Sequence, residues 1–571
     1  MPSLSFRSRR IPLVISSRRS FVVLSALAGL GLPVLAGCEL PRLSRNKGGA
    51  TSSSGSSAPA GGSASASSSA KATSTDWQEL DGHVMGHKVA VRVSPVIRKD
   101  ETTSILALEL TRAKDDASID DINANAYDNN HNEFGLSQYL GVPSIFRPGA
   151  GADLVKLLEL GSGRVWSATD GGGSFLKVTP GEKATSYLSF GKVDADQVTV
   201  MVPMAGFVTV SVLEADAAKK ADIDIDTAQK EIDKYPGSAA ELAEPAAIER
   251  YTRALDDSTS THTGDKDVTV TLASDVTFAS DSADLTPQAD TQLQTVAGQL
   301  AQYPDGGTLT IVGHTDDIQD DAYNQTLSEK RANAVKTRLE QLTKLDKWQT
   351  SVSGKGESEP KINDTSDQAR AANRRVEITL TPTGGTTPKN NTTPTTGSGG
   401  GKLPDPQGPI AKGPEGVTLT AKGTDTSSQV TITLDHVTRQ GGYLLGTVTC
   451  TIKSGSTGGP LHPLLQDPQT LLANQRDEDG GALPTLFASD GLTLVNNGER
   501  IFPADYLDAH AKQHLPLTEL NVSDHLKAGT TTICVVWPDP GGDTTTLDHP
   551  ESKYSIKGTA YRLTDIPIKN S

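Results

Sequence analysis

Hydrophobic positions in residues 268–382 repeat at two different periods. Short runs with alternating apolar residues predict strands, and runs with apolar residues three and four positions apart predict helices between them. The predicted strands cover 268–278, 308–312, 351–353 and 376–380, and the predicted helices cover a segment beginning at Pro287, 321–342 and 368–373. Helices that alternate with strands are typical of an α/β sandwich with a mixed sheet.

The regions on either side, 76–215 and 416–571, contain short alternating runs separated by Gly, Asp and Asn clusters, which predict mostly β structure. Two pairs of segments resemble each other: Leu160–Trp166 with Leu494–Phe502, and Val200–Pro203 with Val535–Pro538. This likeness favours two immunoglobulin-like sandwiches. Two unrelated β domains with similar turns would give the same pattern.

The remaining segments read as connections. Residues 38–75 and 383–415 are rich in Ser, Gly, Thr and other small or polar residues, which cannot bury a core, so we expect a disordered tether and a disordered linker. Residues 216–267 contain many Ala, Lys, Glu and Asp residues with loosely helical apolar spacing in their first part, which predicts a helical linker.

Residues 1–37 are typical of a signal peptide, because basic residues precede a short apolar run. Leu35–Cys38 resembles the lipobox of bacterial lipoproteins, in which Cys38 is diacylated after cleavage. Ser17–Phe21 contains an Arg pair and resembles a twin-arginine export motif. We therefore expect an exported cell-envelope protein held by lipid on the outer side of a membrane. An uncleaved signal anchor and an ordinary basic leader are the alternatives.

Charge and cysteine content narrow the possible partners and sites. The formal charge of −16 argues against nucleic acid, which needs clustered Lys and Arg. The three cysteines form no CxxC or Cys/His cluster, so a zinc site is not expected. Cys450 and Cys534 both lie in strand-like runs, and in an exported protein this predicts a disulfide. Two buried free thiols are the alternative.

One compact group of polar residues lies in the predicted α/β region. Gly313–Asp316 follows a predicted strand, and strand tips are where open α/β sheets tend to place ligands. Asn324 and Arg331 share a face of the next helix. Asp316 could hold an ammonium group and Arg331 a carboxylate, which together suit a zwitterionic amino acid. Alternatively, Asp316 and Arg331 form a salt bridge that only stabilises the fold.

The residues around this group match a longer pattern. Gly313–Asp316, Tyr323-Asn324, Leu327-Ser328, Arg331-Ala332 and Asn373–Val376 resemble the signature of OmpA C-terminal domains. Peptidoglycan-associated lipoproteins and flagellar stator proteins share that signature. The resemblance covers 268–382 and implies that Asp316 and Arg331 grip a diaminopimelate-type residue of the wall's stem peptide.

The resemblance also implies further contacts. Asp281 matches a position whose backbone contacts the ligand, and secondary contacts match Thr315, Asn324, Leu327 and Arg374. The family usually has Gly where this chain has Gln319, inside an acidic run, and the extra carboxylates could favour a cationic ligand or weaken wall binding. We expect His314 to be structural.

These features predict a non-catalytic peptidoglycan-binding lipoprotein that links membrane to wall, with no cofactor and no metal. Neither β region offers a recognisable catalytic constellation, which disfavours a hidden hydrolase. The main alternative is a surface receptor or adhesion protein whose β regions bind an unknown protein or small ligand. The OmpA-like region would then be only an anchor.

Overall fold

The structure is a computed structural model, and it describes residues 74–84, 86–116, 134–135, 154–168, 177–234, 242–386, 403, 405–422, 427–453, 461–466, 488–509, 512–520, 522, 528–551 and 558–571. The predicted signal peptide, the twin-arginine motif, the lipidation residue Cys38 and most of the tether lie outside these residues. Among the described helices, none is both long enough and apolar enough to cross a membrane.

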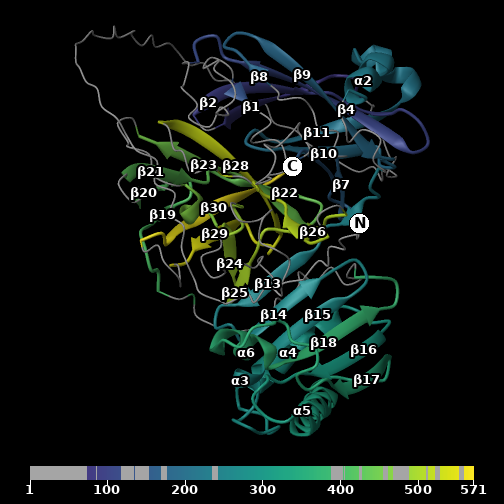
Figure 1. Ribbon diagram of the computed structural model, residues 1–571, viewed down its shortest axis with the longest axis vertical. Helices are drawn as coiled ribbons and strands as arrows, with labels where there is room; N and C mark the ends of the chain where they lie inside the picture. Colours follow the sequence, from purple (N-terminus) through teal and green to yellow (C-terminus); the bar gives the residue numbers. More distant parts are fainter. Residues whose placement is uncertain are drawn as a thin grey trace, which may run out of the picture. The chain divides into compact units, whose positions relative to one another are not determined.

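The central region is an α/β domain at one end of a larger sheet (Figure 1). Its elements are β15 (Val268–Ala273), α3 (Ser274–Thr277), α4 (Ala289–Ala301), β16 (Gly307–Gly313), α5 (Asp321–Leu342), β17 (Trp348–Gly354), α6 (Asp367–Asn373) and β18 (Arg375–Pro382). The strand order is β17-β16-β18-β15. β16 and β17 are parallel and β18 is antiparallel to both its neighbours, so the predicted mixed sheet is confirmed.

The helix α5 carries part of the candidate site and covers the predicted residues 321–342. It begins after Asp320, whose side chain accepts a hydrogen bond from the Tyr323 amide in the manner of an N-cap. Its buried stripe of Ala332, Val335 and Leu339 packs in the core with the inner faces of β15, β16 and β18.

Two glycines let α5 approach the sheet closely. A Cβ added at Gly313 would lie 2.2 Å from the Ser328 carbonyl oxygen, and one at Gly354 would lie 2.3 Å from the Ser328 hydroxyl oxygen. The helix backbone therefore lies directly against the ends of β16 and β17. This contact fixes the N-terminal half of α5 beside the tip of β16, where the candidate ligand residues lie.

In the described residues of the first flanking region, all the regular elements before the 3-10 helix that begins at Ala215 are strands. They are β1 (Gln78–Val84), β2 (His87–Val93), β3 (Val96–Arg98), β4 (Thr103–Arg112), β5 (Phe134–Gly135), β6 (Lys156–Glu159), β7 (Arg164–Ser167), β8 (Lys177–Val178), β9 (Lys183–Gly191), β10 (Gln197–Val202) and β11 (Gly206–Glu214). The main sheet has the order β1-β2-β4-β3-β11-β10-β6-β7-β12, where β12 is Ala246–Ala247, and β9 also pairs with β4.

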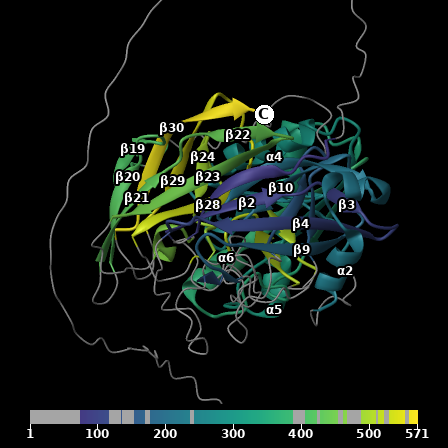
Figure 2. The same cartoon turned by 90° about the horizontal axis from the view of Figure 1, so that it is seen from above.

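The second flanking region adds a short 3-10 turn over His462–Leu464. Its strands are β20 (Val417–Lys422), β21 (Ser427–Thr433), β22 (Val437–Gln440), β23 (Tyr443–Ile452), β24 (Thr493–Asn496), β25 (Glu499–Ile501), β26 (Asp505–Leu507), β27 (His514–Pro516), β28 (Gly529–Pro538), β29 (Thr544–His549) and β30 (Tyr561–Asn570). Both views show β21, β23 and β28 side by side, as their pairing requires (Figure 1, Figure 2).

The two flanking regions bury their apolar side chains in one shared core. Trp166 and Val200 of the first region belong to the same buried cluster as Val448 and Trp537 of the second. The regions therefore do not pack as two independent sandwiches, and an immunoglobulin-like fold is not confirmed for either. Alternating apolar residues identify a strand with one buried face, but they do not specify which sheet covers that face.

The predicted helical linker over 216–267 holds only in its first half. A 3-10 helix covers Ala215–Ala221 and α2 covers Ile225–Ile232. The second half forms the strands β12 (Ala246–Ala247), β13 (Arg250–Ala254) and β14 (Thr259–Thr263). β14 pairs with β15 and β13 pairs with β25, so these strands join the central sheet to the second flanking region. Their mixture of Thr, Ser, Arg and His lacks the apolar alternation that reveals a strand.

The predicted disordered linker over 383–415 also contains a strand. Residues 410–412 form β19 (Ile410–Lys412), which pairs in parallel with β30, and residues 387–402 lie outside the described part of the chain. The pairing partner is about 150 residues away in the sequence, so local composition carries no sign of it.

The predicted disulfide between Cys450 and Cys534 is wrong in this structure, because both residues are buried free thiols. They lie on the paired strands β23 and β28, where Thr447 lies opposite Cys534 and Cys450 lies opposite Thr531. Because the two cysteines are offset by an odd number of positions, their side chains point to opposite faces of the sheet. Accordingly, they belong to different hydrophobic cores.

Candidate ligand-binding site

The predicted site residues come from four parts of the central domain. Thr315 and Asp316 follow β16, Asn324, Leu327 and Arg331 lie on α5, Arg374 joins α6 to β18, and Asp281 lies in the loop after α3. Asp281 has a left-handed backbone with a φ of 51°, and it is exposed. The contacts described below bring most of these positions to one edge of the sheet.

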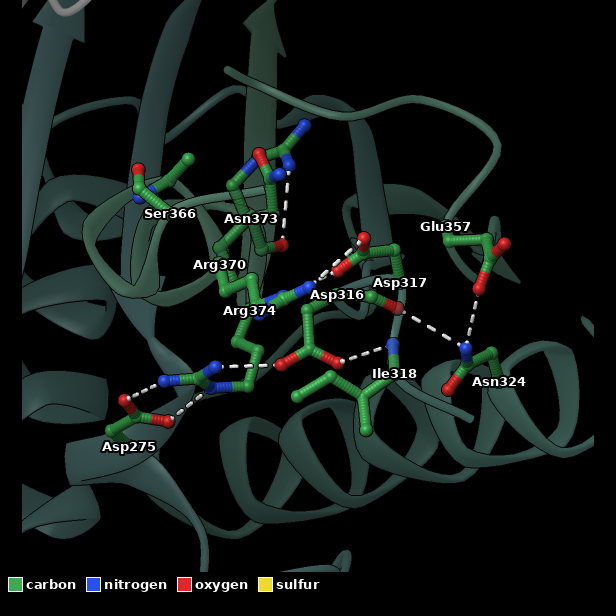
Figure 3. Close-up of polar contacts among 12 residues, drawn as sticks. Asp275, Asp316, Asp317, Ile318, Asn324, Glu357, Ser366, Arg370, Asn373 and Arg374 are labelled. Carbon is green, nitrogen blue, oxygen red and sulfur yellow. Dashed lines mark hydrogen bonds and ion pairs between the residues drawn. The ribbon is translucent and has the colours of Figure 1, made fainter. Parts of the chain in front are cut away.

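The carboxylate of Asp316 is held by Arg374. Its Oδ2 accepts a hydrogen bond from Arg374 Nη1 at 2.6 Å, and its Oδ1 lies 3.4 Å from the Ile318 amide nitrogen (Figure 3). The Asp316 side chain is 12% exposed. Among the described contacts no ion pair joins Asp316 to Arg331, so the structure does not contain the salt bridge that was the alternative interpretation.

Arg374 is shared between two carboxylates. Its Nε and Nη2 donate to the two oxygens of Asp275 at 2.7 and 2.5 Å, on the opposite side from Asp316 (Figure 3). The hydrogen bonds to Asp275, and then those to Asp316, raise the pKa of Arg374 above its ordinary value. Arg374 therefore fixes the Asp316 carboxylate in place with a permanent positive charge.

Arg331 is almost fully buried, with 5% of the residue exposed. Its Nε donates to the Ser282 carbonyl oxygen at 3.0 Å, and its guanidinium carbon lies 5.2 Å from the centre of the Phe278 ring. Burial lowers the pKa of Arg331, and the nearby charges of Asp275 and Asp281 oppose this effect. Arg331 is therefore a cation in a desolvated position beside the Asp275–Arg374 pair.

Asn324 holds the loop after β16. Its Nδ2 lies 3.1 Å from the backbone oxygen of Asp316 and 2.7 Å from a carboxylate oxygen of Glu357 (Figure 3). It also lies 3.1 Å from the backbone oxygen of Gln319. Asn324 therefore contributes as a support for the loop that carries Asp316. The hydroxyl of Thr315 is buried and has no hydrogen-bond partner among the described residues.

The acidic run after Asp316 is largely neutralised or used in the fold. Asp317 forms an ion pair with Arg370 at 2.6 Å (Figure 3), and Asp320 caps α5. The hydrogen bond from Arg370 lowers the pKa of Asp317. The extra carboxylates are therefore not all available to attract a cationic ligand.

His314 lies behind the site in the domain core. Burial, and then the charge of Arg375, lower the pKa of His314 to about 4, so the imidazole is neutral at pH 7. Neither ring nitrogen has a hydrogen-bond partner in the described part of the chain, although Glu377 lies 3.8 Å away. In the same part of the chain, no group of His, Cys, Asp and Glu is arranged to hold a metal ion.

Sequence reasoning missed four residues of the site: Asp275, Ser282, Glu357 and Arg370. Asp275 and Arg370 are charged residues on short helices, and their partners lie 99 and 53 positions away in the sequence. No local pattern in the sequence links residues so far apart, so these contacts could be found only from the structure.

Comparison with known proteins matches residues 277–374 to the OmpA family. The chain is 39% identical over 103 residues to outer membrane porin F of Pseudomonas aeruginosa, which is 18% of this chain and 29% of that protein. It is 41% identical over 119 residues to outer membrane protein A of Citrobacter freundii, which is 19% of this chain and 49% of that relative. The matches thus span less than half the length of these relatives.

Two solved structures are similar to about a fifth of the chain. The cell wall anchor of the T6SS from Pseudomonas aeruginosa has 27% identity and a TM-score of 0.20, covering 22% of this chain and 90% of that one. The peptidoglycan-associated lipoprotein from Burkholderia pseudomallei has 29% identity and a TM-score of 0.16, covering 18% and 86%. Because the family match covers residues 277–374 and the identity to porin F is 39%, these residues form an OmpA-family domain.

Proposed function

We propose that the chain is a non-catalytic peptidoglycan-binding protein of the cell envelope. In this proposal Arg331 binds the carboxylate, and Asp316 the ammonium group, of a diamino acid in the stem peptide. Thr315, Leu327 and the backbone of Asp281 line the same site. The names of two similar proteins, a cell wall anchor and a peptidoglycan-associated lipoprotein, support a wall ligand.

The main support for the proposal is that Arg331 is buried without a paired carboxylate among the described residues. Its guanidinium is buried and donates one described hydrogen bond, from Nε, and no described carboxylate forms an ion pair with it. A buried cation without a paired anion is costly, and a guanidinium can bind a carboxylate through two parallel hydrogen bonds. A ligand carboxylate would therefore supply the partner that the protein itself leaves out.

Asp316 suits the ammonium end of such a ligand. Arg374 occupies one carboxylate oxygen, while the other has only a long contact with the Ile318 amide. An ionised carboxylate can accept several hydrogen bonds, so Oδ1 retains the capacity to bind an ammonium group. Arg374 keeps the carboxylate oriented whether or not the ligand is present.

The test is sedimentation of the full chain with purified walls of diaminopimelate type and of lysine type. We expect stronger binding to diaminopimelate walls, because a lysine side chain has no carboxylate for Arg331. Asp316→Asn should lower the affinity by about tenfold, since a charge-assisted hydrogen bond becomes a neutral one. Asp346→Asn, at an exposed acid on the loop before β17, is the matched control. Equal sedimentation of wild type and Asp316→Asn would refute the assignment.

The proposed anchor is a lipid on Cys38 after export, with twin-arginine export as the favoured route, and it rests on the sequence pattern of residues 17–38. A diacyl group is sufficient for stable membrane attachment, whereas one chain is marginal. We expect the wild-type chain in the membrane fraction and Cys38→Ser outside it. Continued membrane fractionation of Cys38→Ser, after high salt and lysozyme treatment to remove wall contacts, would contradict the lipid anchor.

A further inference from the structure

The OmpA-family domain exposes two large apolar side chains, and both lie close to the candidate site. Ile318 is 62% exposed and Tyr323 is 40% exposed. The other large exposed apolar side chains of the described residues, Leu403, Ile410 and Leu507, lie outside this domain. A single exposed apolar residue is ordinary on a protein surface. Whether Ile318 and Tyr323 contribute to binding therefore depends on where they lie relative to the charged groups of the site.

Ile318 lies at the Asp316 end of the site. Its amide nitrogen is 3.4 Å from Asp316 Oδ1, the oxygen that Arg374 does not bind. Figure 3 shows the Ile318 side chain alongside the Asp316 carboxylate and outside the Arg374–Asp275 pair. A group bound to Oδ1 would therefore have apolar surface directly beside it.

Tyr323 lies on the helix that carries Arg331. It is in the first turn of α5, four positions before Leu327 and eight before Arg331, so the three residues run along one side of the helix. The two exposed apolar residues thus come from the loop after Asp316 and from the helix that carries Arg331. The loop between them is held to α5 by Asn324, so their spacing is fixed by the fold.

We propose that Ile318 and Tyr323 form an apolar rim that packs against the aliphatic chain of the diamino acid whose charged end is bound by Asp316 and Arg331. This inference rests on the proposed function and adds a second criterion to it. Charged ends alone would accept any zwitterionic amino acid. An apolar rim rewards a ligand with a methylene chain leading away from its charged carbon, because that chain leaves water on binding.

The experiment measures binding of two synthetic stem tripeptides to the full chain by calorimetry. One ends in meso-diaminopimelate, and the other ends in its homologue with one methylene fewer. Burial of one methylene group changes a binding constant by about fourfold, so wild type should prefer the longer ligand by about that factor. Ile318→Ser and Tyr323→Ser should each weaken binding of the longer ligand by about fivefold and reduce the preference between the two.

The controls separate the rim from the charged site. Leu507→Ser removes an equally exposed apolar side chain outside the domain and should change nothing. If Asp316→Asn weakens binding while Ile318→Ser and Tyr323→Ser bind both ligands as wild type does, the rim is wrong and the charged site stands. If Asp316→Asn also binds as wild type does, the proposed function fails and the rim with it. Rim variants that lose wall sedimentation but keep tripeptide affinity would indicate a protein or glycan contact, which also overturns the proposal.

Discussion

Replacing Arg331 by lysine should lower the affinity for diaminopimelate walls by about a hundredfold, even though the charge is kept. Lysine cannot form two parallel hydrogen bonds with a carboxylate. It would also lose the contact between Nε and the Ser282 carbonyl, which orients the guanidinium over Phe278. Arg331→Met should abolish binding while the domain stays folded, because an apolar side chain of similar length removes the cost of a buried cation.

The same helix provides the matched control. Arg338 donates from Nε and Nη2 to the two oxygens of Asp290 at 2.7 and 2.9 Å, away from the site. Arg338→Lys therefore breaks a bidentate arginine pair on α5 without touching the ligand residues, and it should bind walls like wild type. The affinity of both variants is measured by sedimentation with diaminopimelate walls over a series of salt concentrations. Wild-type affinity in Arg331→Lys would show that Arg331 acts only as a structural residue.

The central domain could be predicted from the sequence because its pattern is local. Strands with a buried inner face alternate with helices whose stripes are complete, and the long helix over 321–342 was predicted in full. Asp316 and Arg331 could be paired for the same reason, since a strand tip followed by a helix fixes their neighbourhood. Arg374 could be assigned to the site through the family resemblance alone, and nothing in its sequence context indicated that it binds Asp316 and Asp275 together.

The flanking regions were less predictable because long-range pairing determines their architecture. The strands themselves were visible, but the shared core joins Trp166 to Trp537 across hundreds of residues. β13 and β14 contain Thr, Arg and His and lack the apolar alternation typical of a strand. Their strand conformation is stabilised by backbone pairing with β25 and β15. The cysteine prediction failed on a property that is invisible in sequence, the register between β23 and β28.

Two buried glutamates of the second flanking region should have a large effect on how the free energy of unfolding depends on pH. Glu519 accepts hydrogen bonds from the amides of Met204 and Cys534 at 2.7 and 3.0 Å, and burial raises its pKa from 4.5 to about 7. Burial likewise raises the pKa of Glu499 from 4.5 to about 7. At a pH between these two values, both carboxyls are therefore still protonated in the folded protein, whereas in the unfolded chain they are ionised.

Between pH 4.5 and about 7 the folded state binds more protons than the unfolded state, so these two groups make stability fall as pH rises through that window. Each contributes a change of about 3 kcal/mol. His549 acts in the opposite direction, because burial lowers its pKa from 6.5 to about 4 and the unfolded chain then binds more protons. The wild-type curve alone therefore cannot reveal the glutamates, whereas the difference between a variant and wild type can.

Glu519→Gln keeps a carbonyl oxygen for the amides of Met204 and Cys534 and removes the titration. We expect the free energy of unfolding of the variant, relative to wild type, to rise by about 3 kcal/mol from about pH 5 to about pH 8. Denaturant unfolding followed by the fluorescence of the buried Trp166 and Trp537 measures it. Glu340→Gln, at an exposed position on α5, should give a flat difference. A flat difference for Glu519→Gln as well would mean that the Glu519 side chain of the folded wild type is already ionised at about pH 5. The contact between the two flanking regions would then contain a buried carboxylate and not a buried carboxylic acid.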